Sequence, residues 1–404
     1  MNILILDRFL GGDGPGIYIR DLSASLLARG HRVGIGYGRE AGDHVAAGVE
    51  RFHISGLHEQ LLGSDASRSI VKSTLASFAP DVVSAQCLDV LWFAEEVAHR
   101  APLVATLHTH ALTCPNWTRV LWRDRSLCSR DFGPACVWHT IVDRCGSRAP
   151  QAIAGNMLRV FAARSFIPQF AALQAVTPYM RTTLEAAGIS SDKIFDLPYP
   201  APFFDPTRTF TPSTRPLILF VGRLHATKGP DLLLEACARL SVPFEAVFVG
   251  GGPMEREVRR RARALGIARQ CTFFSGHEAS LTRAQISELY LQAALVAVPS
   301  LWGDPAPLVR LEALAHGRPI VGFESGGVSS CVEDGNNGFI VPRLDVSALA
   351  GRIEQILRDA PLRERMGRAA LTKANLEHHP DLLAHRLENI YTSLIAGRSR
   401  RSVA

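Results

Sequence analysis

Two carboxylates stand near a predicted helix start in the stretch 294–321. Residues 294–298 are an apolar run typical of a buried strand, and an amphipathic segment follows it. Asp304 followed by Pro305 reads as an N-cap and a first helical residue, and Glu312 lies about two turns further on. The first N–H groups of a helix attract anions. A ligand with both phosphates and hydroxyls, such as a nucleotide sugar, would suit this arrangement.

A second loop supplies two cations. Residues 217–221 read as another buried strand, and Arg223 and Lys228 follow it in a glycine-rich loop. The carboxyl ends of parallel strands meet at one edge of a sheet, so both should lie near Asp304. A guanidinium and an ammonium together suit a diphosphate. Taken singly, each cation could equally be a solvated loop residue, Asp304 a plain N-cap and Glu312 an exposed helix residue.

The elements that must position these side chains alternate between short apolar strands and amphipathic helices along the 404 residues. This alternation predicts an α/β protein with parallel sheets, and the length favours two domains. A proline-rich passage at 197–216 is the predicted linker. We expect an N-terminal domain at 1–205 with an irregular insertion at 111–150, a C-terminal domain at 215–378, and a last helix at 379–404 that crosses back to the first domain.

Composition narrows the class of protein. The chain is 47% hydrophobic and 20% charged, as in ordinary soluble α/β proteins, and its net charge is +6. This charge suits anionic substrates or an anionic membrane, although a bland basic surface explains it equally well. The N-terminus does not read as a signal peptide, and no apolar run approaches the ~18 residues of a transmembrane helix. The eight cysteines include no CxxC motif, so we expect reduced thiols and a cytoplasmic location.

Several motifs resemble the family 4 retaining glycosyltransferases of the GT-B fold. They include VGRLHATKGPDLLLEA, FVGGGPMEREV, FFSGH and LVAVPSLWGDPAPLVRLEALAHGRPIV in the second half, and ARGHRV and TLHTH in the first. The resemblance covers nearly the whole chain. It implies two Rossmann-like domains with parallel sheets that face an interdomain cleft. It also implies transfer of a sugar from a nucleotide-diphosphate sugar to an acceptor hydroxyl.

The resemblance gives individual residues expected roles. Arg223 and Lys228 match the pair that holds the donor diphosphate, Asp304 the donor-sugar contact, Glu312 the ribose contact, and His108 a histidine near the sugar. A histidine satisfied at a strand end is the alternative for His108. The other matching donor-binding positions are Gly11, Gly12, Gly222, Gly250, Gly276, His277, Leu308 and Val309.

Three positions depart from the family pattern. Asp304 stands where a glutamate is usual, Pro307 lacks an N–H at the helix start, and Ser330 replaces a common glutamate. The departure at Asp304 could weaken the sugar contact or change the sugar class. Two alternatives therefore stay open: a GT-B-fold nucleotide-sugar epimerase, and a binding relative that has lost transfer.

The resemblance also implies a mechanism. Family members retain the anomeric configuration by front-face attack, and the leaving diphosphate helps to deprotonate the acceptor. We find no Asp-x-Asp motif and expect no metal in the donor site and no cofactor beyond the donor itself. The acceptor is expected to be a carbohydrate, a lipid-linked molecule or a small molecule, and nucleic acid is not an expected partner. Bacterial polysaccharide, lipopolysaccharide or secondary-metabolite glycosylation fits, in the cytoplasm or at the inner face of the membrane as a peripheral protein.

The insertion carries a further set of residues with possible chemistry. Its cysteines lack the paired spacing of common zinc sites, so they are either a structural metal site or free thiols in an irregular lid. Its tryptophans and arginines could cover an acceptor, by stacking on sugar rings and meeting phosphate, or could form an ordinary apolar mini-core. These residues are Cys114, Cys128, Cys136 and Cys145; Trp117, Trp122 and Trp138; and Arg119, Arg123, Arg125 and Arg130.

Overall fold

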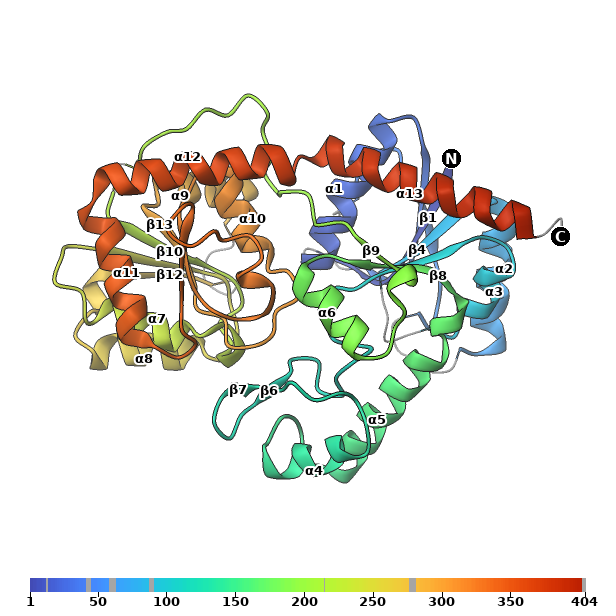
Figure 1. Ribbon diagram of the computed structural model, residues 1–404, viewed down its shortest axis with the longest axis horizontal. Coiled ribbons are helices and arrows are strands. Elements are labelled where there is room, and N and C mark those ends of the chain that lie inside the picture. Colours follow the sequence, from blue (N-terminus) through green and yellow to red (C-terminus); the bar gives the residue numbers. More distant parts are fainter. Residues whose placement is uncertain are drawn as a thin grey trace. The chain divides into compact units, whose positions relative to one another are not determined.

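A computed structural model describes residues 1–11, 14–40, 45–57, 63–86, 91–213, 215–275 and 281–401. The chain divides into two compact units (Figure 1). The first contains Met1–Asp124, Cys128–Pro200 and the C-terminal segment from Pro380, and the second contains Arg125–Leu127 and Ala201–His379. Each unit is built on its own parallel sheet.

The first unit has a seven-stranded sheet in the order β3-β2-β1-β4-β5-β8-β9, with every pairing parallel. Its central strands are almost wholly buried, which is why they read as continuous apolar runs. The strands are β1 (Asn2–Leu10), β2 (Arg32–Glu40), β3 (Glu50–His53), β4 (Val82–Ala85), β5 (Leu103–Thr106), β8 (Phe170–Ala175) and β9 (Ile194–Asp196).

Helices follow β1, β3, β4, β5 and β8 in the chain and lead to the next strands of the parallel sheet. The last helix, α13, belongs to the first unit, where Arg29, the residue after α1, donates from Nε to Glu388 Oε2 at 3.0 Å. The helices are α1 (Gly14–Ala28), α2 (Asp65–Phe78), α3 (Ala94–Ala98), α4 (Ala135–Val142), α5 (Pro150–Ser165), α6 (Pro178–Ala186) and α13 (Pro380–Arg401).

The second unit has a six-stranded sheet in the order β12-β11-β10-β13-β14-β15, again with parallel pairings. The order matches that of a doubly wound Rossmann sheet, which reverses direction between its first and fourth strands. The strands are β10 (Leu217–Val221), β11 (Glu245–Val249), β12 (Cys271–Phe274), β13 (Leu295–Val298), β14 (Ile320–Phe323) and β15 (Gly338–Val341).

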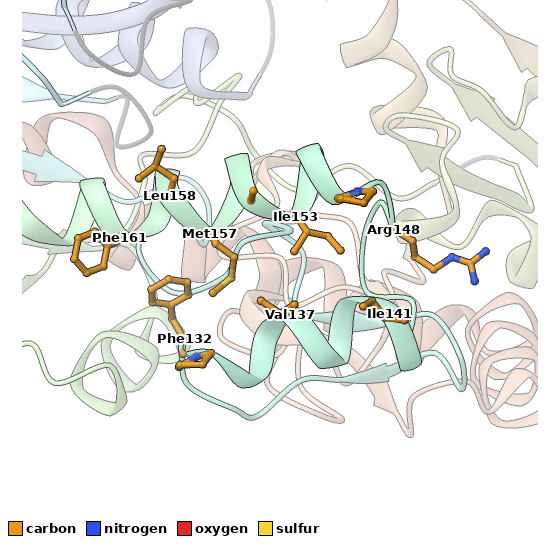
Figure 2. Close-up of a pocket in the computed structure, with 12 residues that line it drawn as sticks. Phe132, Val137, Ile141, Arg148, Ile153, Met157, Leu158 and Phe161 are labelled. Carbon is orange, nitrogen blue, oxygen red and sulfur yellow. The ribbon is translucent and has the colours of Figure 1, made fainter.

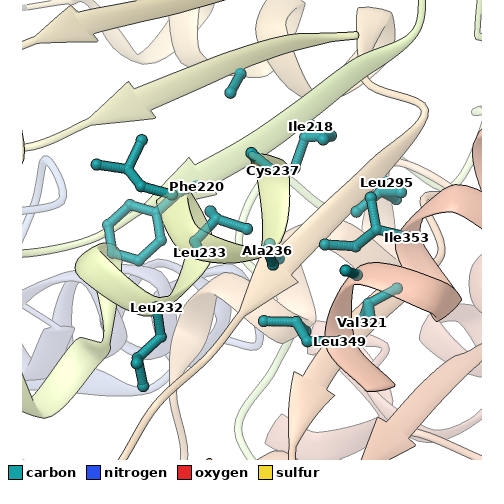
Figure 3. Packing of buried hydrophobic residues seen from close by; sticks show 14 of the residues in the cluster. Ile218, Phe220, Leu232, Leu233, Ala236, Cys237, Leu295, Val321, Leu349 and Ile353 are labelled. Atoms are coloured by element: carbon teal, nitrogen blue, oxygen red, sulfur yellow. The ribbon is translucent and has the colours of Figure 1, made fainter. Parts of the chain in front are cut away.

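A single apolar cluster joins this sheet to the helices over one of its faces. Figure 3 shows Ile218 and Leu295 of the sheet packed with Leu233 of α7 and Ile353 of α11. Each of these four side chains is fully buried. The helices of the unit are α7 (Pro230–Cys237), α8 (Glu255–Ala264), α9 (Arg283–Gln292), α10 (Leu308–Ala315), α11 (Val346–Arg358) and α12 (Ala360–Glu377).

The insertion is more regular than its sequence suggests. A two-stranded sheet forms from β6 (Val120–Leu121) and β7 (Ser126–Leu127), and α4 follows it. The expectation of an irregular stretch over 111–150 is therefore wrong for these elements. The helix α4 is short, and its apolar residues point largely to solvent, so no core-facing stripe marks it in the sequence. Among the residues that the structure describes, no helix combines the length and hydropathy needed to cross a membrane.

Candidate functional site

Two loops of the second unit follow β10 and β13, the neighbouring strands at which the order of the sheet reverses. In open α/β sheets, ligands bind outside the carboxyl ends of the strands at this reversal. The loop after β10 runs from residue 222 to 229, and the loop after β13 runs from residue 299 to 307. They carry the cations and the first carboxylate singled out above.

Backbone contacts hold these two loops together. Gly229 has a φ of 65°, and a Cβ at this position would lie 2.2 Å from the carbonyl oxygen of Pro299. Leu301 N–H also donates to the carbonyl of Thr227 at 2.7 Å. A side chain at position 229 would therefore push the loops apart, and glycine allows the approach that brings their functional residues together.

Lys228 and Asp304 form an ion pair across the two loops. Asp304 is 5% exposed, and the Lys228 ammonium also lies over the ring of Trp302, 5.2 Å from its centroid. A buried carboxylate needs such a partner, since its desolvation is costly. The sequence predicted that Lys228 and Asp304 would be close, but it assigned them to different parts of a ligand. The structure adds that they contact each other, and that Trp302 packs on the pair.

Arg223 lies in the same loop as Lys228. Its side chain is exposed, whereas His225 between the two cations is partly buried. Burial lowers the pKa of His225, and the positive charges of Arg223 and Lys228 lower it further. A neutral imidazole is thus flanked in the chain by two cations, and the positive charges of both act on it. Such a field favours an anionic ligand.

The helix start differs from its prediction. α10 begins at Leu308 with Pro307 as its N-cap residue, and no side chain caps it, so the expectation that Asp304 is the N-cap is wrong. The reason is Pro307, because a residue that precedes proline is driven out of the helical region. Ala306 accordingly lies outside the helix. Leu308 and Val309 remain the first helical residues, so their N–H groups are those at the positive end of the helix dipole.

A glycine pair packs against the backbone near Asp304. Gly327 N–H donates to the carbonyl of Asp304 at 2.6 Å, and a Cβ on Gly327 would lie 2.1 Å from the carbonyl oxygen of Pro305. Gly326 has a φ of 47°, and a Cβ on it would lie 2.7 Å from backbone atoms of both Gly303 and Asp304. These contacts hold the Asp304 backbone in place, so the carboxylate is positioned from both sides.

The second carboxylate, Glu312, is fixed by a residue that the sequence did not indicate. Tyr290 of α9 donates from Oη to Glu312 Oε2 at 2.5 Å, and both residues are buried. Burial raises the pKa of Tyr290 well above its usual range, and the neighbouring carboxylate raises it further. The tyrosine is thus a permanent donor. Glu312 is a held carboxylate and not the exposed helix residue of the alternative reading.

His316 supports this arrangement one turn further on. Its ring stacks on Tyr290 with the centroids 4.8 Å apart, and its Nε2 lies 2.8 Å from Ser287 Oγ. Its Nδ1 lies 2.7 Å from the carbonyl of Glu312. Burial lowers the pKa of His316 to about 3, so the ring is neutral in the physiological range. Phe203 packs edge-on against the same ring.

Arg310 is a further charged residue that sequence reasoning missed. It lies in the first turn of α10, is 1% exposed, and donates from Nη1 to Ser330 Oγ at 2.9 Å. Its Nε and Nη2 are buried without a hydrogen-bond partner. Ser330, noted above as a departure from the family pattern, therefore contacts a buried cation. Only spatial neighbours reveal this pairing, since the two residues lie on different elements.

Of the other predicted donor-binding positions, the structure describes some and not others. Gly250 packs against the loop after β10, because a Cβ on it would lie 2.4 Å from the carbonyl oxygen of Gly222. Gly222 itself has a φ of 149°, a backbone conformation that favours glycine. The predictions for Gly12, Gly276 and His277 fall outside the residues that the structure describes.

In the first unit, His108 follows β5 and both of its ring nitrogens have partners. Nε2 lies 2.7 Å from Gln86 Oε1, and Nδ1 contacts the hydroxyl of Tyr199, whose ring stacks on the histidine. Gln86 donates from Nε2 to Ser84 Oγ, which fixes its oxygen toward His108. Burial lowers the pKa of His108 to about 3. The imidazole is neutral and held, as in the alternative of a satisfied histidine, and its role near a sugar stays a prediction.

Gly11 is the one described member of the glycine loop prediction in this unit. It follows β1, and a Cβ on it would lie 2.2 Å from the ring of Phe9. The neighbouring strand β4 leads to Gln86, so the reversal of strand order between β1 and β4 brings both to one edge of the first sheet.

The insertion cysteines line one small pocket, together with His139 and Asp131. The seven cysteines in the described part of the chain form no disulfide. Burial raises the pKa of the Cys114 and Cys145 thiols, which favours the protonated thiol over the metal-binding thiolate. Across the described ranges, no group of three or more histidine, cysteine or acidic side chains is arranged to hold a metal. A four-cysteine metal site stays a prediction.

Comparison with known proteins identifies both halves of the chain. Residues 12–198 match the model of Glycosyltransferase Family 4, and residues 204–373 match that of Glycosyl transferases group 1. The D-inositol 3-phosphate glycosyltransferase of Mycolicibacterium smegmatis is 35% identical over 173 residues, 41% of this chain and 37% of that protein. The alpha-D-kanosaminyltransferase of Streptomyces kanamyceticus is 30% identical over 185 residues, 45% of this chain and 46% of that protein. The matches thus span less than half the length of these curated relatives.

Solved structures resemble the whole chain. Anabaena HepE in complex with UDP superposes with a TM-score of 0.72 at 19% identity, covering 97% of this chain and 100% of HepE. Sucrose-phosphate synthase from Thermosynechococcus elongatus gives a TM-score of 0.74 at 18% identity, covering 98% and 99%. At this level of identity the similarity concerns the fold, which is the two-domain GT-B fold predicted from the sequence.

Proposed function

We propose, from the premise that this chain belongs to the group 1 glycosyltransferases of family 4, that it is a retaining glycosyltransferase. Its donor is a nucleotide-diphosphate sugar and its acceptor carries a hydroxyl group. One observation carries the proposal: the Lys228–Asp304 pair joins the loops after β10 and β13, where the strand order reverses. Rossmann-like sheets bind their ligands at this place.

The site residues of the second unit each have a role in this proposal. Arg223 and Lys228 bind the diphosphate, and the N–H groups of Leu308 and Val309 add the positive end of the α10 dipole. Glu312 accepts hydrogen bonds from the ribose, since Tyr290 holds one of its oxygens and fixes its direction. Asp304 contacts the donor sugar while it orients Lys228. Solved structures of HepE, which has a similar fold, are complexes with UDP and with UDP-glucose, and this supports a donor of the same class.

The reaction needs little covalent participation by the protein. The bond between the anomeric carbon and the diphosphate oxygen breaks, and the electron pair leaves with the diphosphate. The acceptor oxygen bonds to the same face of the carbon, and its proton passes to the departing diphosphate. The protein lowers the barrier by stabilising the charge that develops on the leaving group, which is the work of Arg223, Lys228 and the helix start.

The site residues can be tested by substitution. Arg223→Ala removes an exposed side chain and should leave the fold intact, while Glu312→Gln keeps the size of the residue. At donor concentrations below the KM, each should lower the turnover of a nucleotide-diphosphate sugar by about a hundredfold, Arg223→Ala through lost stabilisation of the leaving diphosphate and Glu312→Gln through weaker donor binding. Nucleotide release measures both. Lys373→Ala is the control, because it removes a cation of the same unit that lies on α12 and pairs with Glu333 and Glu377. Near-normal turnover in both site variants would reject the assignment.

An epimerase of the same fold is the second candidate and is distinguished by its product. Incubation of the protein with a panel of nucleotide sugars, without acceptor, should release nucleotide and free sugar slowly if the protein is a transferase. An epimerised donor would support the isomerase instead. Binding without any turnover, even with acceptors supplied, would support a relative that has lost catalysis.

A further inference from the structure

The helices α4 and α5 leave an apolar groove open between them. The groove has a volume of about 900 Å³ and is lined mainly by Val137, Ile141, Ile153, Met157 and Phe161. Figure 2 shows the two helices side by side with these side chains between and around them. Among the exposed large hydrophobic residues of the described chain, five of seven lie on this pair of helices. Such a concentration marks an interaction surface.

The helix α5 has a buried inner face and an exposed outer face. On the inner face, Val160 is fully buried, and Arg159 is 8% exposed and donates to the carbonyls of Ala111 and Pro115. On the outer face, Leu158 is 57% exposed and Phe161 is 67% exposed. The inner face attaches the helix to the unit, so the outer face is not needed for attachment and remains available to a partner.

The outer face of α4 continues this surface. Trp138 is 65% exposed and Ile141 is 47% exposed, and their spacing puts them on adjacent turns of one side. We call the exposed residues Val137, Trp138, Ile141, Leu158 and Phe161, which all exceed a third exposure, the outer face of the insertion.

The charge around this outer face is almost entirely positive. Residues 111–166 contain eight arginines against three aspartates, with no lysine or glutamate, and so carry +5 of the chain's net charge of +6. Neither α4 nor α5 contains an acidic residue. Arg144 and Arg148 are exposed at the end where the two helices connect, and Arg148 lines the groove itself (Figure 2).

We propose that the outer face of the insertion docks the protein onto a membrane that contains anionic phospholipid. Phe161, Leu158 and Trp138 enter the boundary between headgroups and acyl chains, and Arg144 and Arg148 meet the phosphates. An apolar face with arginines at its border and an aromatic residue is the pattern of helices that lie in a membrane interface. The negative surface potential attracts the arginines before the apolar groups insert.

A second copy of the chain fits this surface less well. Symmetric pairing would bring the arginine-rich insertion of one molecule against the same insertion of the other. Like charges opposed across an interface are unfavourable, and the insertion holds too few aspartates to neutralise them. Anionic lipid satisfies the apolar groups and the arginines at the same time.

Vesicle co-sedimentation of the full chain tests the proposal. The protein should bind vesicles of phosphatidylcholine and phosphatidylglycerol in equal parts, and bind vesicles of phosphatidylcholine alone much more weakly. The double variant Leu158→Gln/Phe161→Gln should bind the mixed vesicles about tenfold more weakly or worse, since two apolar side chains no longer insert. Arg144→Gln/Arg148→Gln should lose about fivefold per arginine, and high salt should have a similar effect on the unaltered protein.

Leu376→Gln is the matched control. Leu376 is 68% exposed, about as much as Phe161, but it lies on α12 and not on the insertion. This variant should therefore bind vesicles like the unaltered protein. Equal binding by the Leu158/Phe161 variant and the unaltered protein would overturn the proposal, and so would no binding by either. Loss of self-association in the Leu158/Phe161 variant, seen by sedimentation velocity without vesicles, would assign the surface to a second copy and also overturn it.

Discussion

The loops around Lys228 and the insertion around Phe161 are built on opposite plans. In the loops, the buried carboxylate of Asp304 is paired with Lys228, and backbones approach so closely that Gly229 and Gly327 have no room for a Cβ. In the insertion, apolar groups are exposed, and Gly155 of α5 has nothing within 4 Å of a Cβ position. Close packing in the first region holds polar groups in fixed positions, whereas the second region leaves apolar side chains exposed.

This difference separates two kinds of binding. A site for a small polar ligand needs groups held in place before the ligand arrives, since ordering them afterwards costs binding free energy. A surface that enters a membrane needs an exposed apolar face with cationic side chains beside it. The contrast predicts which substitutions disturb the fold and which disturb only binding, and the following experiments can sharpen or break it.

The largest effect is expected for Gly229→Ala. The new Cβ would lie 2.2 Å from the carbonyl oxygen of Pro299, at a φ of 65°, so the variant should lose about 3 kcal/mol or more of unfolding free energy. Gly155→Ala in the insertion is the paired change, and it should gain about 0.5–1 kcal/mol, because alanine suits an open helix position better. Urea unfolding of both variants measures this. Equal losses at the two positions would mean that the two regions do not differ in packing.

A large effect should also appear with pH. The pKa of the buried His316 is lowered to about 3, so the unfolded chain binds a proton more readily than the folded one between that value and about 6.5. Stability should therefore fall as the pH drops through this window, by about 1.4 kcal/mol per pH unit from this residue. His316→Asn should flatten the slope between pH 7 and pH 5, measured by urea unfolding. An unchanged slope would show that His316 is solvated.

Much of this architecture could be predicted from the sequence because its signals are local. The strand at 295–298 and the one at 217–221 are apolar runs that end in glycine or proline, and parallel topology then brings their loops to one edge. The helix start at Leu308 was misplaced because the proline signal was read at Pro305, whereas Pro307 sets the boundary. Both prolines suit a helix start, and only the restriction on Ala306 separates them.

The partnerships inside the site could not be predicted in the same way. The Lys228–Asp304 pair joins residues 76 apart in sequence, and Tyr290 reaches Glu312 across 22 residues. No local pattern marks a tyrosine in a helix as a carboxylate's partner, because the same residue serves equally as apolar core. The outer face of the insertion was missed for a different reason, since the sequence does not show whether an apolar residue of a helix is buried or exposed.

A smaller effect is expected for Tyr290→Phe. The change removes the hydroxyl that donates to Glu312 at 2.5 Å and leaves a buried carboxylate oxygen without this donor, so about 1–3 kcal/mol of unfolding free energy should be lost. If Glu312 binds ribose, the KM for the donor should also rise, with kcat less affected. Kinetics with varied donor concentration measure this. A variant with lower stability but an unchanged KM would leave Tyr290 a purely structural residue.

The smallest effect on stability is expected where the effect on membrane binding should be largest. Phe161 and Leu158 are 67% and 57% exposed and belong to the outer face of the insertion, so their replacement by glutamine should change the unfolding free energy by no more than about 0.5 kcal/mol. Val160→Ala, one residue from Phe161 but fully buried on the inner face, should instead cost about 1–3 kcal/mol through the cavity that it leaves. Thermal unfolding of the variants compares the two faces of one helix. If the outer-face variant proves as unstable as Val160→Ala, Leu158 and Phe161 stabilise the fold. The insertion would then not differ from the loops in leaving its apolar side chains free for binding.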